Sequence, residues 1–259
     1  METIISPYDV LLIQNLRITS MKSLIQKWGI TIYLLILSIH LYAQVLGDNF
    51  KNLQVITKVI LLPILILFLT CQDTFKKNSN TKWFIIIALF GSFCGDVLLT
   101  NEKYFIIGMV AFMTTHIFNI IFFNNQNGIG QQKSKKLILF TILLIAFCVL
   151  IYFKLKGAMG GLIYPILVYM VLICTAALMS IHAGGNKKGE LISKLFWFPG
   201  MLFFITSDTV LAFNKFDWSI NHPIKNIGLV TMLTYGFAQL LLVKGFQIYL
   251  KQLTYFEQH

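Results

Sequence analysis

The chain has 259 residues, of which 57% are hydrophobic and only 12% are charged, a composition that excludes an ordinary soluble domain and is typical of a membrane protein. Its mean hydropathy of +0.75 agrees with this. The net charge of +11 does not indicate nucleic-acid binding, because the lysines and arginines occur singly or in twos and threes between apolar runs and form no basic stripe.

The predicted elements begin with residues 1–27, which mix polar and apolar positions and lack a clear cleavage site. They predict a cytoplasmic or interfacial segment and not a signal peptide. Met21 is an equally good start, so the first 20 residues could be an upstream extension.

Eight apolar runs follow, and each is long enough, at about 20 residues with a rise of 1.5 Å, to cross a 30 Å hydrocarbon layer. Their connections are short, which leaves no room for a soluble domain. The sequence therefore predicts an all-α, polytopic integral membrane bundle of eight transmembrane helices over residues 28–251, with a cytoplasmic tail at 252–259. The runs lie near residues 28–46, 53–70, 82–100, 104–123, 136–153, 162–182, 194–213 and 225–250.

The distribution of lysine and arginine predicts the orientation of this bundle. The tails and loops on one side carry 13 of these residues and those on the other side carry six. Because the more basic side of a multipass protein stays in the cytoplasm, both termini are expected to be cytoplasmic. In a bacterial cell the membrane would be the inner one.

Two aspartates interrupt the apolar runs. Asp96 follows Lys82 by 14 residues and Asp208 follows Lys194 by 14, so both are expected about 21 Å from the cytoplasmic face. A buried ionised carboxylate is costly, which favours a functional role for the pair. Each is followed by a similar string, Asp-x-x-Leu-x-x-x-Lys, which suggests a parallel repeat of four helices, with chance similarity as the rival explanation.

Further polar side chains lie at depths from which they could reach the carboxylates. Lys58 stands five residues before Pro63, and a kink at the proline could aim the lysine inward. The small residues beside Asp96 would permit close helix approach. Each of the other polar residues, taken alone, is explained by helix packing, and they are His40, His116, Tyr235 and Gln239.

Two carboxylates at one depth are not both readily ionised, so one is expected to keep its proton beside the other, charged one. Such a pair suits hydrolysis through an oxocarbenium-like transition state and equally intramembrane aspartyl proteolysis. The neighbours of the two aspartates fit the protease poorly, and no Pro-Ala-Leu string occurs. No two of the five histidines have helical ligand spacing, so neither a metal nor another cofactor is predicted.

Four strings hold the candidate residues in a fixed order: Ser92-x-x-Gly95-Asp96-x-Leu98-Leu99, Phe105-x-x-Gly108-x-x-x-Phe112-x-x-x-His116, Phe203-x-x-x-Ser207-Asp208-x-x-Leu211-Ala212-x-Asn214-Lys215-Phe216 and Tyr235-x-x-Ala238-Gln239-x-Leu241. With the Thr57-Lys58 element, they cover spans two to eight. In this order they resemble the lysoplasmalogenase family, also called YhhN-like. Lys58 is followed by valine where the resemblance leads us to expect proline.

The resemblance implies an eight-span membrane hydrolase that cleaves the vinyl ether of a lysoplasmalogen to a fatty aldehyde and a glycerophospho-base, with Asp96 and Asp208 as the essential carboxylates. One would act as general acid, and the other would stabilise the cation and activate water; the residues do not decide which. Lys58 would face the substrate phosphate. The remaining auxiliary or substrate-binding candidates are His116, Ser207, Lys215, Tyr235 and Gln239.

The expected partners are a lysophospholipid and the bilayer, without nucleic acid, and the oligomeric state and lipid head group stay open. The alternative is a small transporter or lipid-binding protein that uses the paired aspartates as a proton or cation site. The repeat favours this alternative, while the lack of matching glycine-rich broken helices weighs against it. Carboxyl groups roughly 5–9 Å apart across a blind, lipid-accessible pocket would favour hydrolysis.

Overall fold

The computed structural model describes residues 7–77, 81–126, 135–185, 189–216 and 226–256, and within these ranges the regular structure is helical without any strand. Short turns of other helix types join the main helices: η1 (Asp48–Phe50), η2 (Glu102–Tyr104), η3 (Gly160–Leu162), η4 (Ala183–Gly185) and the π-helical η5 (Ser193–Trp197). The α-helices are α1 (Pro7–Leu46), α2 (Lys51–Thr70), α3 (Asp73–Lys77), α4 (Thr81–Leu98), α5 (Phe105–Asn124), α6 (Lys135–Met159), α7 (Ile163–His182), α8 (Glu190–Ile192), α9 (Phe198–Phe216) and α11 (Ile227–Phe256).

The eight predicted runs coincide with the eight helices of 18 or more residues that the described ranges contain: α1, α2, α4, α5, α6, α7, α9 and α11. Seven described stretches are long and apolar enough to cross a membrane, and one of them, Leu137–Gly185, has 49 residues. That stretch contains α7 and all but the first two residues of α6, and the chain turns between the two helices at η3. The protein is thus a helical membrane protein, while eight crossings, both termini in the cytoplasm and the division at residues 27 and 251 stay predictions.

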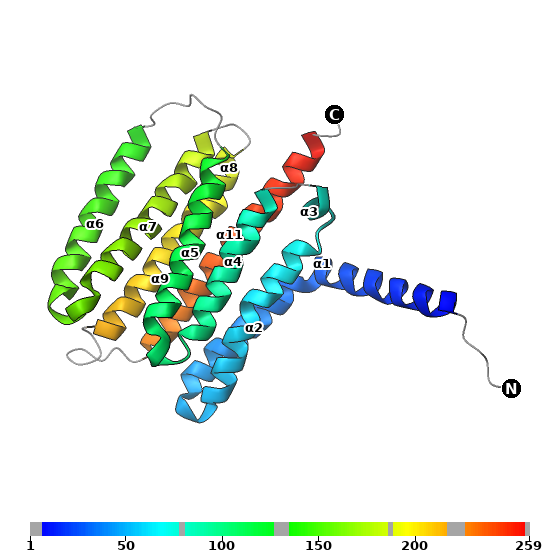
Figure 1. The fold of residues 1–259 in the computed structure, drawn as a ribbon, viewed down its shortest axis with the longest axis horizontal. Helices are drawn as coiled ribbons and strands as arrows, with labels where there is room; N and C mark the ends of the chain where they lie inside the picture. Colours follow the sequence, from blue (N-terminus) through cyan, green and yellow to red (C-terminus); the bar gives the residue numbers. More distant parts are fainter. Residues whose placement is uncertain (1–6, 78–80, 127–134, 186–188, 217–225, 257–259) are drawn as a thin grey trace.

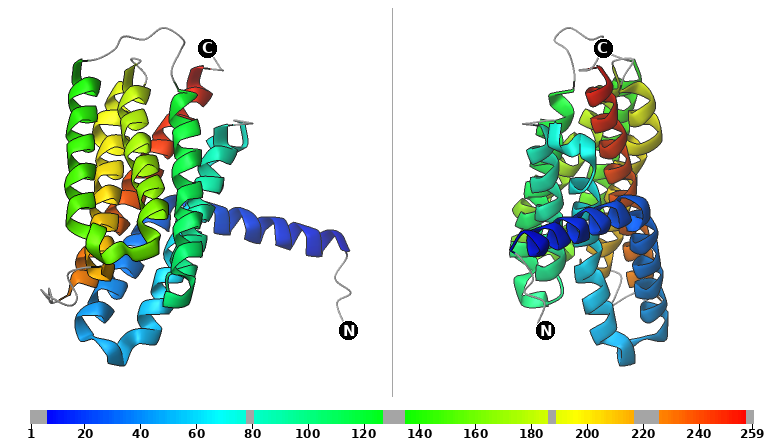
Figure 2. Two further views of the ribbon diagram at one scale, coloured as in Figure 1. Left: turned by 60° about the vertical axis from the view of Figure 1, so that its left-hand side comes forward. Right: turned by 90° about the vertical axis from the view of Figure 1, so that its right-hand side faces the viewer.

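The long helices run side by side as a bundle, with α6 at one edge and α1 and α2 at the other (Figure 1). The closest neighbours are α4 and α5, α9 and α11, and α1 and α2. The first part of α1 projects from the bundle at a steep angle to the rest of the helix (Figure 2). Large apolar side chains cover the outside of the bundle, as a lipid-facing surface requires, and examples are Leu150, Val171, Ile142 and Tyr42.

Helices α4 and α5 approach closely because glycines face α5. A Cβ atom added at Gly95 would lie 2.5 Å from the Phe112 ring, and one added at Gly91 would lie 2.8 Å from Thr115 Oγ1. The small side of α4 therefore lets the two backbones come together, as is common between membrane helices. This contact carries Asp96, one residue after Gly95, into the interior, where it is 3% exposed.

An aromatic core closes the end of the bundle near the C terminus. Phe122 lies with its ring centroid 4.9 Å from that of Phe246 and 5.5 Å from that of Trp197. Trp197 ends the π-helical turn that precedes Pro199, and a proline lacks the amide hydrogen that a regular helix would use. Aromatic side chains therefore fill this end of the bundle.

Candidate functional site

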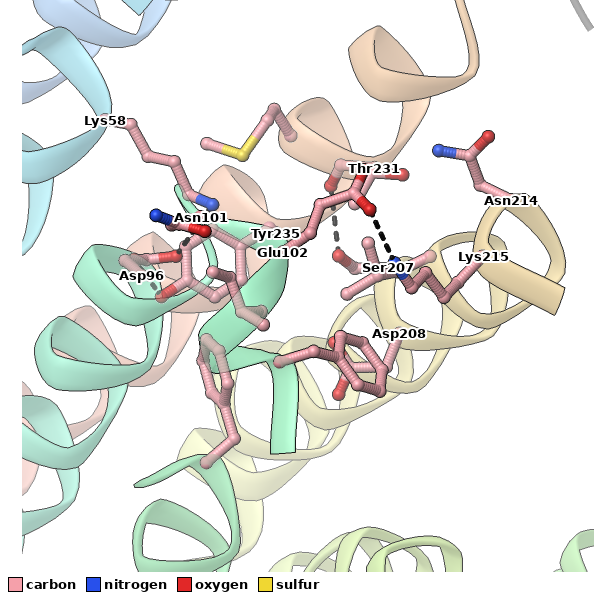
Figure 3. A pocket seen from close by; sticks show the side chains of 15 residues that line it. Lys58, Asp96, Asn101, Glu102, Ser207, Asp208, Asn214, Lys215, Thr231 and Tyr235 are labelled. Atoms are coloured by element: carbon pink, nitrogen blue, oxygen red, sulfur yellow. Dashed lines mark hydrogen bonds and ion pairs between the residues drawn. The ribbon is translucent and has the colours of Figure 1, made fainter. Parts of the chain in front are cut away.

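A cavity of about 530 Å³ opens between the helices at the end of the bundle opposite the C terminus. Its walls come from α2, α4, α5, α9 and α11 and from the turn that contains η2. Both aspartates line it, Asp96 from α4 and Asp208 from α9 (Figure 3). Two carboxylates separated by 112 positions in the chain therefore face one space, and they do not lie on opposite sides of the bundle.

Asp96 has a cation and a hydroxyl as partners. Lys58 Nζ lies 3.7 Å from Asp96 Oδ1, and the Tyr235 hydroxyl donates a hydrogen bond of 2.6 Å to Asp96 Oδ2 (Figure 3). The lysine side chain is 19% exposed and reaches the carboxylate from α2. A buried carboxylate that has both a cation and a hydroxyl donor is stabilised in its charged form.

Asp208 has a different environment. The Tyr169 hydroxyl, from α7, donates a hydrogen bond to Asp208 Oδ2, and His116 Nε2, from α5, lies 3.1 Å from the same hydroxyl. Because the tyrosine uses its only hydrogen toward the carboxyl group, His116 donates to the tyrosine oxygen. The other ring nitrogen, His116 Nδ1, is buried without a hydrogen-bond partner in the described part of the chain.

The two carboxylates are therefore unlike each other. Among the described residues, Asp96 forms an ion pair with a lysine and Asp208 forms none. Asp208 instead ends a line of neutral groups, from His116 through Tyr169. In a low-dielectric interior an unpaired carboxylate is far more costly than a paired one. This geometry favours a proton on Asp208 and a negative charge on Asp96.

The other predicted site residues fall at different distances from this pair. Ser207 lines the cavity and its hydroxyl donates to the Thr231 carbonyl at 3.0 Å. Lys215 lies at the rim of the cavity mouth, and its ammonium group donates to Glu102 Oε2 at 3.1 Å. The Glu102 side chain is 90% exposed. Gln239 donates to Ser92 Oγ at 3.0 Å and is not a lining residue of the cavity.

His40 lies in a separate polar cluster between α1 and α2. Its Nδ1 atom is 2.9 Å from Thr57 Oγ1 and its Nε2 atom is 3.1 Å from Gln44 Nε2. The threonine hydroxyl in turn donates to the Leu53 carbonyl at 2.6 Å. These contacts satisfy both ring nitrogens, which supports the packing explanation for His40. The ammonium group of Lys58, next to Thr57 in the chain, pairs with Asp96.

Tyr169 is the residue that sequence reasoning missed. Tyr164, on the same helix, is 79% exposed on the outside of the bundle, whereas Tyr169 reaches the carboxyl group. The available signal was a hydroxyl inside the apolar run at 162–182. Other lining residues of the mouth that were not predicted as site residues are Asn101, Glu102, Asn214 and Thr231.

No group of three or more histidine, cysteine, aspartate or glutamate residues that could hold a metal ion occurs in the described ranges. What the site offers chemically is one carboxyl group paired with a lysine and one bonded to a tyrosine. The donor set suits proton transfer.

Comparison with known proteins gives a single finding. The family model described as the YhhN family matches residues 53–246, a range that begins within α2, ends within α11 and includes every residue that lines the cavity. No match was found among curated proteins or among solved structures. The match extends over most of the 259 residues, and the chain belongs to the YhhN family.

Proposed function

We propose that the protein is a membrane-embedded hydrolase that cleaves the vinyl ether bond of a lysoplasmalogen to release a fatty aldehyde and a glycerophospho-base. The YhhN family includes lysoplasmalogenases. The observation that carries the proposal is the unequal pair of carboxylates, Asp96 and Asp208, that line one cavity in an apolar bundle.

Hydrolysis of a vinyl ether begins with proton transfer to carbon, and Asp208 is the group that we assign as acid. Its hydrogen bond with Tyr169 occupies Oδ2 and leaves Oδ1 to carry the proton. Transfer of this proton to the β-carbon of the vinyl ether breaks the O–H bond, forms a C–H bond and leaves an oxocarbenium ion. The deprotonated Asp208 then lies beside the cation that it has created, and opposite charges attract most strongly in a water-poor site.

Asp96 is the group that we assign as base. It stays charged because Lys58 lies 3.7 Å away and Tyr235 donates to it. When water attacks the oxocarbenium carbon, Asp96 accepts a proton from the water, and a hemiacetal results. In the collapse, the hemiacetal hydroxyl returns its proton to Asp208, and Asp96 gives its proton to the departing glyceryl oxygen. Both carboxyl groups regain their starting states, and the net reaction consumes one water molecule.

The rim of the cavity suits the phosphate of such a substrate. Lys58 and Lys215 line the same space from α2 and α9, and lysine ammonium groups bind phosphate as point charges. The Lys215 ammonium is held by Glu102, whose side chain extends into solvent. A head group at the mouth would place the ether bond deeper in the cavity, toward the two carboxylates.

The test is aldehyde release from a purified alkenyl lysophosphoethanolamine by the protein in detergent, with aldehyde measured by a coupled dehydrogenase. Asp96→Asn and Asp208→Asn should each lower turnover by about 100- to 10,000-fold, the usual contribution of a general acid or base. Asp48→Asn, at an exposed position of η1, is the matched control and should retain activity. Full turnover by either site variant would refute the mechanism, and a complete lack of aldehyde with wild-type protein would favour the non-enzymatic alternative.

A further inference from the structure

Two smaller cavities adjoin the main one, and both are apolar. The first, of about 60 Å³, shares Leu99, Phe105, Phe112, Asp208 and Leu211 with the main cavity. The second, also about 60 Å³, shares Ile166, Tyr169, Asp208 and Ala212 with the first. Asp208 lines all three spaces, so the carboxyl group stands where a polar space meets an apolar one.

The apolar spaces lead away from the mouth and toward the edge of the bundle. The first lies between α5, α7 and α9, and the second lies between α6, α7 and α9. The lining of the second extends from Phe147 to Leu155 on α6, about 12 Å at 1.5 Å per residue. Helix α6 is the outermost helix on this side (Figure 1), so the two cavities run beneath an edge that faces lipid.

We propose that these two cavities, named here the chain slot, hold the aliphatic chain of a single-chain ether phospholipid whose head group lies in the main cavity. The polarity of the three spaces matches the polarity of such a lipid from end to end. Lysines 58 and 215 stand at the head-group end, Asp208 stands at the junction, and the slot beyond it has apolar walls apart from Asp208, Tyr169, Thr209 and two cysteines. The choice of lipid rests on the proposed function.

The slot orients its ligand and does not add affinity through the hydrophobic effect. A lipid chain is already surrounded by hydrocarbon in the bilayer, so its transfer into an apolar slot gains little from removal of water. The gain is positional: a chain held in the slot directs the adjoining vinyl ether to Asp208, and a fixed approach accelerates reaction. The signature of the slot is therefore a dependence of turnover on chain length that changes when the slot is filled or widened.

Ala212 is the position at which the slot can be filled, because it lines both apolar cavities. Ala212→Leu should lower turnover of a hexadecenyl lysolipid at least tenfold relative to an octenyl lysolipid. Ile151→Ala, which enlarges the second cavity, should shift the chain-length preference of turnover toward longer chains than the wild type prefers. Ala146→Leu makes the same change as Ala212→Leu at an exposed position of α6 and should alter neither substrate.

A labelling experiment tests the slot without any need for hydrolysis. A saturated 1-O-hexadecyl lysophosphoethanolamine with a diazirine at the end of its chain is not a vinyl ether, so protonation at carbon cannot cleave it. In wild-type protein in lipid nanodiscs, the label should attach to slot residues of α6 and α7, and Ala212→Leu should reduce that labelling severalfold while Ala146→Leu leaves it unchanged.

The two experiments separate the failure of the slot from that of the proposed function. Labelling in the slot without aldehyde release from a vinyl ether would uphold the slot and refute the hydrolase. Aldehyde release with a label scattered over lipid-facing residues, or with equal chain-length profiles for Ala212→Leu and Ala146→Leu, would overturn the slot and leave the hydrolase intact. If size exclusion shows that Ala212→Leu does not fold, the chain-length profile of Ile151→Ala and the labelling of wild-type protein test the slot instead.

Discussion

The replacement Tyr169→Phe examines the line of groups that ends at Asp208. It removes a hydroxyl that donates to Asp208 Oδ2 and lies 3.1 Å from His116 Nε2, while it leaves the ring and its T-shaped contact with His116 in place. Asp208 then loses its only described hydrogen-bond donor, and its side chain gains freedom to turn away from the substrate.

The size of the expected effect follows from the two hydrogen bonds that are lost, Tyr169 to Asp208 and His116 to Tyr169. A neutral buried hydrogen bond contributes about 0.5–1.5 kcal/mol net, and a buried donor left without an acceptor, here His116 Nε2, costs about 1–3 kcal/mol of folding stability. We expect kcat to fall about 5- to 30-fold, equivalent to about 1–2 kcal/mol of transition-state stabilisation. The value of KM should change by less than about 3-fold, since Tyr169 positions the acid and does not hold the head group.

The assay is aldehyde release over a range of substrate concentrations at a temperature where thermal melts show both proteins folded. Tyr164→Phe is the matched control: it removes the same hydroxyl from the same helix at a side chain that is 79% exposed, and it should keep wild-type kinetics. Wild-type kcat for Tyr169→Phe would refute the positioning role. A rise in KM with kcat unchanged would also refute it, because Tyr169 would then be binding substrate.

Two further replacements examine the other carboxylate and the helix contact that carries it. Lys58→Met removes the cation 3.7 Å from Asp96 and should lower kcat by about 10-fold or more, since an unpaired buried carboxylate tends to become neutral. Lys58→Arg keeps the positive charge and should retain much of the activity. Equal kinetics for the two variants would contradict the role of the cation. Gly95→Ala places a Cβ atom 2.5 Å from the Phe112 ring and should destabilise the bundle by about 1–3 kcal/mol, seen as a lower melting temperature. Gly157→Ala is the control: no atom lies within 4 Å of its added Cβ, so the melting temperature should not fall. Equal melting temperatures for the two variants would contradict the close approach of α4 and α5.

The helices were predictable because the membrane leaves the backbone few choices. In hydrocarbon each backbone polar group must be satisfied internally, so a long apolar run forms a helix, and each predicted run coincides with a long helix. The prediction differs from the structure mainly at helix ends: α1 already begins at Pro7, whereas the first run was predicted from residue 28, and α6 continues to Met159 and α11 to Phe256. Apolar composition marks the hydrocarbon-facing part of a helix and says little about where the helix stops.

The partners of the carboxylates were less predictable. Tyr235, His116 and Gln239 were expected near the aspartates because of their depth and the family resemblance, but of these three only Tyr235 bonds to an aspartate directly. His116 contacts the Tyr169 hydroxyl, which bonds to Asp208, and Gln239 bonds to Ser92. Depth along a helix restricts a residue to one level of the membrane, while its direction around the helix axis decides which neighbour it meets.

The sequence by itself determined that this chain is a helical membrane protein and that Asp96 and Asp208 interrupt its apolar runs, because hydropathy and charge are properties of each segment alone. Only the tertiary structure decided that the two carboxylates differ. Lys58 lies beside Asp96 and Tyr169 beside Asp208, and these pairings join helices whose contacts depend on packing, as at Gly95 against Phe112. The proton that each carboxylate holds or lacks is therefore a consequence of which helices touch.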